Sequence, residues 1–347
     1  MIQCDDLRIG LQNVLKQIDF DLLFILSDTN TATLCLPLLQ QTGLIDNACL
    51  IQIPAGEANK NLDTLASVWT NLCEYKATRR SLLLNLGGGM VTDLGGFAAS
   101  TFKRGIRFIN LPTTLLAAVD AAVGGKTGID FHGLKNEIGA FAPATAVLID
   151  TAFFKTLDHA NFLSGYAEML KHSLIHAYDE WQKLLRFDLE TIHYPTLSAL
   201  LTTSVKIKEA IVASDPKEKG LRKALNFGHT IGHAMESFCL EKRQPVLHGY
   251  AVAWGMACEL YLSFLKLDFD RDQLSETVRF IKTHYGTFAF NCDHYDRLYE
   301  LMLHDKKNNN AEEISFTLIK AIGDIRIDQV VQKSDILEAF DFFREFC

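Results

Sequence analysis

Short apolar runs alternate with longer mixed segments through the first 150 residues of the chain. The runs that predict strands are residues 22–27, 50–53, 81–86, 107–111 and 146–149. Helix-length stretches, among them residues 64–75 and 92–101, lie between these runs. Strands that alternate with helices usually form a parallel sheet that is covered by helices. The first half of the chain is therefore predicted to be an α/β domain.

From about Ser164 onward, the apolar positions repeat at helical spacing, and Tyr166, Leu170 and Leu174 fall on one stripe. Further helices are expected at residues 196–213, 228–239, 250–265 and 335–346, and a strand at residues 314–318. No linker rich in proline, glycine or serine separates the two halves, so we expect them to pack closely around a cleft. The sequence predicts a Rossmann-like α/β N-terminal domain over residues 1–157 and a mostly α-helical C-terminal domain over residues 158–347.

The composition fits a folded protein of two domains. The chain has 347 residues, of which 48% are hydrophobic and 22% are charged. A net charge of -8 argues against nucleic acid or an anionic membrane surface as the main partner. It does not exclude small anions, because a binding site responds to local charge more than to the screened total.

The sequence also favours a cytoplasmic location. Residues 1–6 lack the basic start and apolar core of a secretory signal. The longest apolar windows, such as residues 250–258, are shorter than the ~20 residues that a membrane helix needs. The eight cysteines are scattered and form no CxxC pair, so we expect reduced thiols rather than a disulfide framework.

A run of three glycines, residues 87–89, follows an apolar strand and precedes a helix. Such a turn lets a phosphate approach the backbone at a helix N-terminus, although a tight strand-to-helix turn with no ligand is the alternative. Thr92 stands where the standard dinucleotide fingerprint has glycine. Asp28, which also follows a strand, is interpreted either as an acceptor for a ribose hydroxyl or as a helix cap.

The segment Gly124-Gly125-Lys126-Thr127 resembles the end of a Walker phosphate loop. The full motif fails, because Asp120 stands where it requires glycine. Lys135 and Asn136 follow closely, and lysine is a compact cation with three donors. We interpret the segment as an anion site in a mobile loop, with a merely solvated loop as the alternative.

His229 and His233 are four residues apart, so they share one face of a predicted helix. With His248 close in sequence, this pattern favours a metal site over histidines that are simply buried in the core. The central glutamate of the HExxH motif is absent. Zinc prefers nitrogen and oxygen ligands, and Glu168 is the best carboxylate candidate.

The C-terminal half of the chain also contains several basic residues: Lys171, Lys208, Arg222, Lys306 and Lys307. Each alone is interpreted as a solvated surface charge. Together with a metal and two glycine loops, they predict an enzyme that handles a polyanionic small molecule and uses a nucleotide cofactor.

Six blocks of the sequence, taken together, resemble one known family. Residues 119–130, 133–141, 164–175, 225–236, 247–256 and 305–307 resemble, in order and spacing, the 3-dehydroquinate synthase family of the shikimate pathway. The resemblance implies conversion of 3-deoxy-D-arabino-heptulosonate 7-phosphate to 3-dehydroquinate and phosphate, with NAD+ and a divalent metal, zinc or cobalt. It implies transient oxidation of the C5 alcohol, phosphate elimination, return of the hydride and intramolecular aldol closure.

The resemblance also implies which residues bind the metal, catalyse the reaction and bind the substrate. It implies Glu168, His229 and His248 as metal ligands, with His233 beside the metal, which replaces the interpretation of both helix histidines as ligands. The implied catalytic residues are Lys126, Lys171, Arg222, Asn226 and His233. The implied substrate-binding residues are Arg104, Asp120, Lys135, Asn136, Lys208, Glu218, Lys306 and Lys307.

The implied NAD+ contacts lie in the α/β domain. They are Asp28, Asn30, Ala55, Gly56, Glu57, Lys60, Gly88, Gly89, Met90, Val91, Thr92, Asp93, Thr113, Thr114, Lys126, Lys135, Phe153, Phe154, Lys155 and Thr156. Arg104 matches an arginine that the family lends to the neighbouring subunit, so a homodimer is implied. The chain departs from the family pattern at Thr92, at Ala58-Asn59 and at Gly133-Leu134.

The sequence leaves three alternative functions open. Inosose-forming and valiolone-forming sugar phosphate cyclases share the metal and NAD chemistry, but the intact Gly-Gly-Lys-Thr and Lys-Asn segments favour dehydroquinate formation. A glycerol-dehydrogenase-like metal alcohol dehydrogenase would oxidise its substrate with net NADH formation. A binding protein without catalytic activity would require the loss of a ligand or a key lysine, and none is lost.

Overall fold

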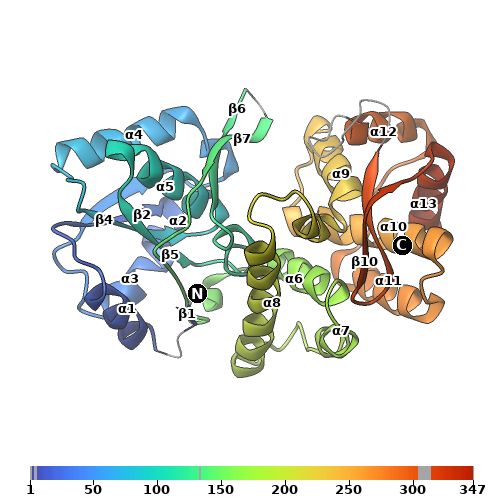
Figure 1. Cartoon of the computed structure of the whole chain (residues 1–347), viewed down its shortest axis with the longest axis horizontal. Helices are drawn as coiled ribbons and strands as arrows, with labels where there is room; N and C mark the ends of the chain where they lie inside the picture. The colour runs from blue at the N-terminus through green and yellow to red at the C-terminus, as the bar shows by residue number, and fades with distance from the viewer. Residues whose placement is uncertain (1, 4–5, 133, 304–313, 347) are drawn as a thin grey trace. The chain divides into compact units, whose positions relative to one another are not determined.

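The computed structural model describes residues 2–3, 6–132, 134–303 and 314–346. The chain divides into two compact units, Met1–Phe162 and Leu163–Cys347 (Figure 1). Helix α6 (His159–Leu174) begins in the first unit and continues into the second. The boundary that we predicted from the sequence, after residue 157, falls just before this helix.

The first unit contains a parallel six-stranded sheet. Its strands are β1 (Ile2–Gln3), β2 (Leu23–Asp28), β3 (Cys49–Ile53), β4 (Leu82–Gly87), β5 (Arg107–Pro112) and β8 (Ala146–Ile149), in the order β1-β8-β5-β4-β2-β3. The strands that we predicted from apolar runs are confirmed. Every residue of β2 and β4 is buried, because helices cover both faces of the sheet.

The helices of this unit are α1 (Leu7–Lys16), α2 (Thr29–Leu34), α3 (Leu36–Gln40), α4 (Leu62–Glu74) and α5 (Gly89–Thr101). Helices α4 and α5 lie on one side of the sheet, and α1 and α3 on the other (Figure 1). Val68 of α4, Leu83 of β4 and Leu94 of α5 are fully buried in one hydrophobic cluster. Each such side chain contributes about 1.5–3 kcal/mol by leaving water, so this cluster fixes α4 and α5 against the sheet.

The segment that we predicted to be a mobile loop is a β-hairpin, so that interpretation was wrong. Strand β6 (Lys126–Phe131) pairs with β7 (Leu134–Phe141) in antiparallel register. Ile129 is fully buried in the cluster with Leu94, which anchors β6. Strand β7 is almost wholly exposed, so it carries no alternation of buried and exposed residues that the sequence could reveal.

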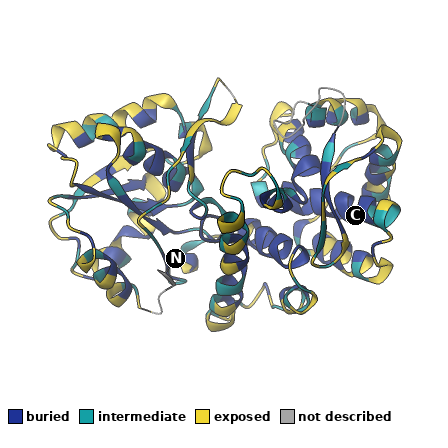
Figure 2. Cartoon of the chain, in the orientation of Figure 1, coloured by how far each residue is buried: buried dark blue, intermediate teal, exposed yellow. Residues whose placement is uncertain are grey.

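The second unit is mostly helical. It contains α7 (Tyr178–Leu185), α8 (Tyr194–Ser214), α9 (His229–Glu241), α10 (His248–Leu267), α11 (Arg271–Tyr285), α12 (Tyr295–Leu303), α13 (Lys333–Phe346) and the antiparallel pair β9 (Ser315–Ala321) and β10 (Asp324–Val330). Figure 2 shows α10 as a buried element of this unit, and its residues Ala251 and Met256 are fully buried. Because α10 lies at the centre of the unit, it can hold side chains from neighbouring helices in fixed positions.

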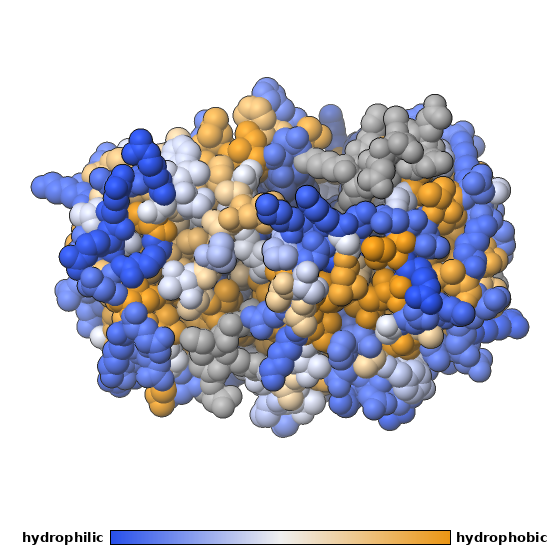
Figure 3. Space-filling view, in the orientation of Figure 1, coloured by the Kyte–Doolittle hydropathy of each residue, from blue (hydrophilic) through white to orange (hydrophobic). Residues whose placement is uncertain are grey.

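None of the helices described is both long and apolar enough to span a bilayer. On the face shown in Figure 3, hydrophilic side chains predominate along the outer margins, and hydrophobic ones are exposed in scattered groups. Scattered exposed hydrophobic side chains are normal for a folded protein.

Candidate functional site

The parallel sheet has a topological switch point between β2 and β4. Strand β2 is followed along the chain by β3 on one side, whereas β4 is followed by β5 on the other. Ligands of open α/β sheets bind outside the carboxyl ends of the strands at such a point. Strand β2 ends at Asp28 and β4 at Gly87. Two groups that we predicted to bind a nucleotide therefore lie at neighbouring strand ends.

The N-terminus of α5 fits an anion. Gly88 is the N-cap residue and makes no side-chain cap, so the first N–H groups of the helix have no capping side chain in front of them. Thr92, which departs from the family pattern, lies buried in the first turn, where its hydroxyl donates to the Gly89 carbonyl at 3.1 Å. The departure therefore leaves the strand-to-helix turn intact.

Asp28 is a helix cap. Its Oδ1 atom accepts hydrogen bonds from the backbone N–H groups of Asn30 and Thr31, both at 2.8 Å. The capping interpretation is therefore confirmed, and it leaves the carboxylate held at the switch point. A proposed contact to a ribose hydroxyl is compatible with this position.

Lys60 joins several of the predicted cofactor and substrate residues in the first unit. Its ammonium lies 2.6 Å from Asp93 Oδ2 and 2.5 Å from Asn136 Oδ1, and only 3% of the side chain is exposed. Burial opposes the charge on Lys60, but attraction by Asp93 and Glu57 outweighs it and raises the pKa of the lysine. The backbone N–H of Asn136 in turn donates to Asp130 Oδ1 at 2.7 Å. The hairpin is thus tied to the start of α5 through a charged lysine.

The remaining residues implied for NAD+ follow other strands of the same sheet. Thr113 and Thr114 follow β5, and the Thr113 N–H donates to the Gly87 carbonyl at 3.0 Å. The implied residues Ala55, Gly56 and Glu57 follow β3, and Phe153, Phe154, Lys155 and Thr156 form a 3-10 turn after β8. Met90 and Val91 lie in α5, and both side chains belong to the hydrophobic cluster. Any contact of Met90 or Val91 with a cofactor would therefore use the backbone.

Cys35, which no sequence motif indicates, lies beside Thr156, one of the implied NAD+ contacts. The buried thiol of Cys35 lies 3.6 Å from Thr156 Oγ1. Burial raises the pKa of this thiol, so it stays protonated. The two residues are 121 positions apart, so no sequence motif could have connected them.

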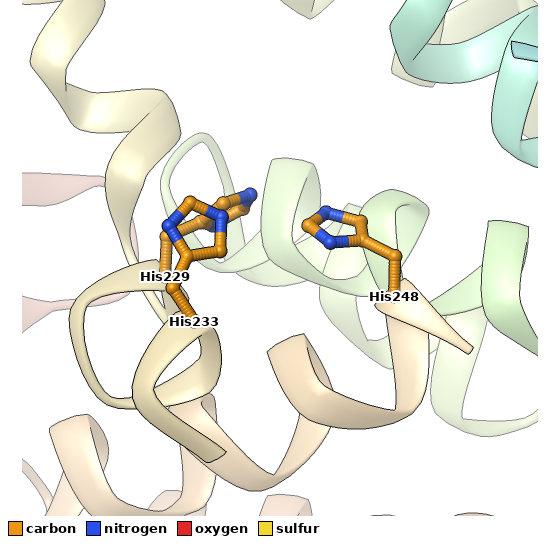
Figure 4. A group of neighbouring side chains, drawn as sticks. All are labelled: His229, His233 and His248. Atoms are coloured by element: carbon orange, nitrogen blue, oxygen red, sulfur yellow. The ribbon is translucent and has the colours of Figure 1, made fainter. Parts of the chain in front are cut away.

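Three histidines gather in the second unit (Figure 4). His229 and His233 come from the first turns of α9, and His248 is the first residue of α10. Their ring centroids are 5.2 to 5.8 Å apart, and each offers a nitrogen to a group that could hold a metal ion. The predicted histidine cluster is therefore present.

Glu168, from α6, faces this cluster and is fully buried. Its Oε1 atom lies 3.4 Å from His229 Nε2 and 3.5 Å from His248 Nε2. In a tetrahedral site, ligand atoms about 2.1 Å from a zinc ion lie about 3.4 Å from one another. Two imidazoles and one carboxylate also form a donor set that suits zinc or cobalt. These residues therefore fit a divalent metal.

Both histidines are held so that Nε2 faces Glu168. His229 Nδ1 lies 3.0 Å from the Phe227 carbonyl, and His248 Nδ1 lies 3.3 Å from Glu236 Oε2. Contacts of this kind fix the ring orientation of metal-ligating histidines. Burial opposes a charge on His248, but the hydrogen bonds to Glu168 and Glu236 outweigh it and raise the pKa of His248 to about 10. The surrounding carboxylates therefore favour positive charge at this position.

The basic residues of the second unit lie in its interior rather than on its surface. Lys171, Lys208 and Arg222 are 1%, 5% and 3% exposed, so the interpretation of each as a solvated surface charge was wrong. Buried charges are costly without partners, and Lys171 forms an ion pair with Glu168. Their burial fits a role inside a site.

The 3-10 segment Leu221–Asn226, which directly precedes α9, carries two further predicted residues. Arg222 Nη1 donates to the Pro216 carbonyl at 2.9 Å, and Asn226 Nδ2 donates to Glu218 Oε1 at 3.0 Å. The implied substrate-binding residue Glu218 and the implied catalytic residue Asn226 are thus in direct contact.

Other predicted residues are placed within the first unit. Lys126 and Lys135 are exposed on the hairpin, Arg104 is exposed in the turn after α5, and Asp120 is half-buried in a short π-helix, Ala117–Ala121. The structure does not bring Arg104 into the Lys60 network. Lys306 and Lys307 lie outside the described residues.

Two family models match most of the chain, one after the other. The model described as 3-dehydroquinate synthase N-terminal matches residues 50–164, and the model described as 3-dehydroquinate synthase C-terminal matches residues 165–308. The chain belongs to the 3-dehydroquinate synthase family. The family predicted from the sequence motifs is confirmed. A 3-dehydroquinate synthase of Parabacteroides distasonis is 53% identical over 345 residues, which cover 99% of this chain and 98% of the relative.

Solved structures share the fold of this 3-dehydroquinate synthase family member. A 2-epi-5-epi-valiolone synthase from Streptomyces hygroscopicus with NAD+ and Zn2+ bound has a TM-score of 0.87 at 24% identity, over 99% of this chain and 96% of that one. A 2-deoxy-scyllo-inosose synthase complexed with carbaglucose-6-phosphate, NAD+ and Co2+ has a TM-score of 0.85 at 22% identity, over 97% of this chain and 94% of that one. The predicted fold class, a Rossmann-like unit followed by a helical unit, is confirmed.

Proposed function

We propose that this chain converts 3-deoxy-D-arabino-heptulosonate 7-phosphate to 3-dehydroquinate and phosphate. The observation that carries the proposal is the full-length identity of 53% to a 3-dehydroquinate synthase. The geometry supports it, because the Nε2 atoms of His229 and His248 face one oxygen of Glu168 at 3.4 and 3.5 Å. The reaction belongs to the cyclising carbon–oxygen lyases, and it forms part of aromatic amino acid biosynthesis.

We assign the cofactor sites on this basis. Glu168, His229 and His248 would hold zinc or cobalt, and the strand ends around Asp28 and Gly88 would hold NAD+. When bound, the metal supplies polarisation of the substrate C5 hydroxyl, and NAD+ supplies a hydride acceptor that is regenerated. Support comes from the donor set and from the two sugar phosphate cyclases that hold NAD+ with Zn2+ or Co2+.

The chain's own residues bind and orient the substrate in this proposal. Lys126, Lys135, Lys208 and Arg222 bind the carboxylate and phosphate through charge-assisted hydrogen bonds. His233 is assigned to holding or moving a proton, because its ring lies beside the rings of the two proposed histidine ligands. Lys171 lies next to Glu168 and forms an ion pair with this ligand carboxylate.

The rival functions have weaker support. The inosose-forming and valiolone-forming cyclases are 22% and 24% identical to this chain, which establishes the fold alone. A glycerol-dehydrogenase-like enzyme would accumulate NADH during turnover. Net NADH formation therefore separates that function from the proposed one.

The direct test is a phosphate-release assay with product identification. Purified protein with NAD+ and zinc or cobalt should release phosphate from the heptulosonate phosphate, form 3-dehydroquinate and produce no net NADH. A chelator should stop the reaction. Activity on other sugar phosphates with none on this substrate would contradict the assignment.

Glu236 is expected to support the metal site through His248. Replacing Glu236 by glutamine removes the carboxylate that contacts His248 Nδ1 at 3.3 Å. Loss of such a contact typically weakens metal affinity about 10-fold to 100-fold. A competition titration with a chromogenic chelator measures the change. Glu241→Gln is the control. Glu241 lies on the same helix as Glu236 but forms an exposed pair with Arg297 of α12, so its replacement should leave the affinity unchanged.

We also propose a homodimer in which Arg104 completes the partner's phosphate site, and a cytoplasmic location. Arg104 is exposed, and its backbone has a positive φ of 69°, as expected of a residue presented in a tight turn. Arg104→Ala should raise the KM for the substrate about 10-fold or more with a smaller effect on kcat, because one charged hydrogen bond contributes about 1.5–3 kcal/mol. Lys103→Ala, at the adjacent exposed lysine, is the control.

Mixed dimers test the sharing of Arg104. When Arg104→Ala chains are mixed with Glu168→Gln chains, a hybrid holds one site with an intact Glu168 and an intact Arg104 from the partner. Activity should therefore recover to a fraction of the parent value. Mixtures that regain nothing, or a monomer with full activity, would remove the shared site.

A further inference from the structure

Helix α9 begins without a cap of its own. Its N-cap residue is Gly228, which has a left-handed φ of 78° and no side chain to accept a hydrogen bond. The first N–H groups of a helix have no partner within the helix, so a buried helix start needs an acceptor from elsewhere. The next residue is the proposed metal ligand His229, so whatever caps this end also fixes the backbone of that ligand.

A carboxylate from α10 supplies the missing cap. Glu259 Oε2 accepts from the Gly228 N–H at 2.5 Å, and Glu259 Oε1 accepts from the Ile231 N–H at 3.1 Å. The Glu259 side chain is fully buried. A negative charge at a helix N-terminus is favoured by the helix dipole, and bonds from backbone N–H groups to a carboxylate are stronger than neutral ones.

The carboxylate reaches α9 because the two helices pack at very short distance. A Cβ atom added at Gly255 would lie 2.0 Å from the Gly228 carbonyl oxygen, and one at Gly232 would lie 2.7 Å from the Ala251 carbonyl oxygen. Helix α10 therefore runs directly against the start of α9, where Glu259 can span both N–H groups at once.

Helix α10 also carries a proposed metal ligand. His248 is its first residue, and Glu259 follows about three turns later on the same rigid element. The position of His248 is set by α10 itself, and the position of His229 is set by the contact of α9 with Glu259. The separation of the two imidazoles therefore depends on how α9 packs on α10, and Glu259 bonds to α9 at this contact.

We propose that Glu259 is a positioning residue for the metal site. It holds the first turn of α9 on α10, so that His229 and His248 present their Nε2 atoms to Glu168 at matching distances. This inference rests on the ligand set of the proposed function.

Cobalt binding tests this role directly. The visible absorption bands of a Co2+-loaded protein report the coordination geometry, which a loss of stability alone does not change. In Glu259→Gln the amide oxygen can accept only one of the two N–H bonds, and its NH2 group faces the other donor. We expect Co2+ to bind 10-fold to 100-fold more weakly, in the range seen when outer-shell partners of metal ligands are lost. We also expect shifted visible bands.

Thr277→Val is the matched control. It removes a fully buried hydroxyl that accepts from Trp181 Nε1 at 3.1 Å in the same unit, remote in sequence from α9. Thermal unfolding should show comparable destabilisation in the two variants, whereas the Co2+ affinity and spectrum of Thr277→Val should match those of the parent chain.

Two results would overturn the inference. Glu259→Gln could bind Co2+ with the parent affinity and spectrum, or Thr277→Val could shift the spectrum equally. If Glu259→Gln does not fold, Glu259→Asp is measured instead, and the same spectral shift is expected from the shorter side chain. Failure of the parent chain to release phosphate would contradict the proposed function and leave this metal-binding test unaffected.

Discussion

Glu168→Gln is expected to lower kcat by about 10³-fold or more and to abolish tight metal binding. The substitution keeps the size of the side chain but removes the negative charge that faces His229 and His248. Metal ions supply several kcal/mol of charge stabilisation to a transition state, and each tenfold loss in rate corresponds to about 1.4 kcal/mol. The buried ammonium of Lys171 also loses its partner, which typically costs about 3–5 kcal/mol of stability.

Metal content and rate should be measured on the same Glu168→Gln preparation. Bound zinc after dialysis and phosphate release from the heptulosonate phosphate should fall together. Glu180→Gln is the control, because Glu180 forms a partly exposed pair with Lys183 on α7, and exposed ion pairs contribute little to stability. Unchanged zinc content and unchanged rate in Glu168→Gln would refute the ligand set.

The sheet could be predicted from the sequence because burial on both faces leaves a continuous apolar run. Strands β2 and β4 are buried at every position, so they stand out in the sequence. The hairpin and β10 could not be predicted in this way. Strand β7 is almost wholly exposed, and β10 has only exposed and half-buried positions, so pairing with a neighbour decides their structure rather than their own pattern.

The histidine cluster could be predicted for a different reason. His229 and His233 lie four residues apart on one helix, and helix geometry alone places them on one face. Their contacts with residues distant in sequence could not be predicted from spacing. Glu168 lies on α6 and Glu259 on α10, and only the packing of these helices brings their carboxylates to α9.

The burial of the basic residues could not be predicted from the sequence either. Lysine and arginine usually lie on the surface, and nothing in the local sequence shows that Lys171, Lys208 and Arg222 are buried. Burial of a charge depends on partners supplied by other segments, such as Glu168 for Lys171. The family resemblance identified these residues, whereas the structure gives the physical reason for their position.

Gly255→Ala is expected to reduce the free energy of unfolding by about 3 kcal/mol or more, a large part of the roughly 5–15 kcal/mol typical of a folded domain. The added methyl group would lie 2.0 Å from the Gly228 carbonyl oxygen and 2.6 Å from the Gly232 nitrogen. Both are backbone atoms, so no side-chain rotation can make room, and α9 must move away from α10. The same movement would pull Gly228 from Glu259 and separate His229 from His248.

Helix propensity predicts the opposite sign for this substitution, and that conflict makes the test decisive. Alanine is favoured over glycine by about 1 kcal/mol inside a helix, so Gly255→Ala would stabilise the chain if packing were unimportant. Ala253→Gly, on the same helix, should cost only about 1–2 kcal/mol through lost propensity and a lost methyl group. Denaturant unfolding of both variants should therefore show two losses, with the larger at Gly255. A Gly255→Ala protein as stable as the parent would mean that the close contact between α9 and α10 does not hold the metal ligands in place.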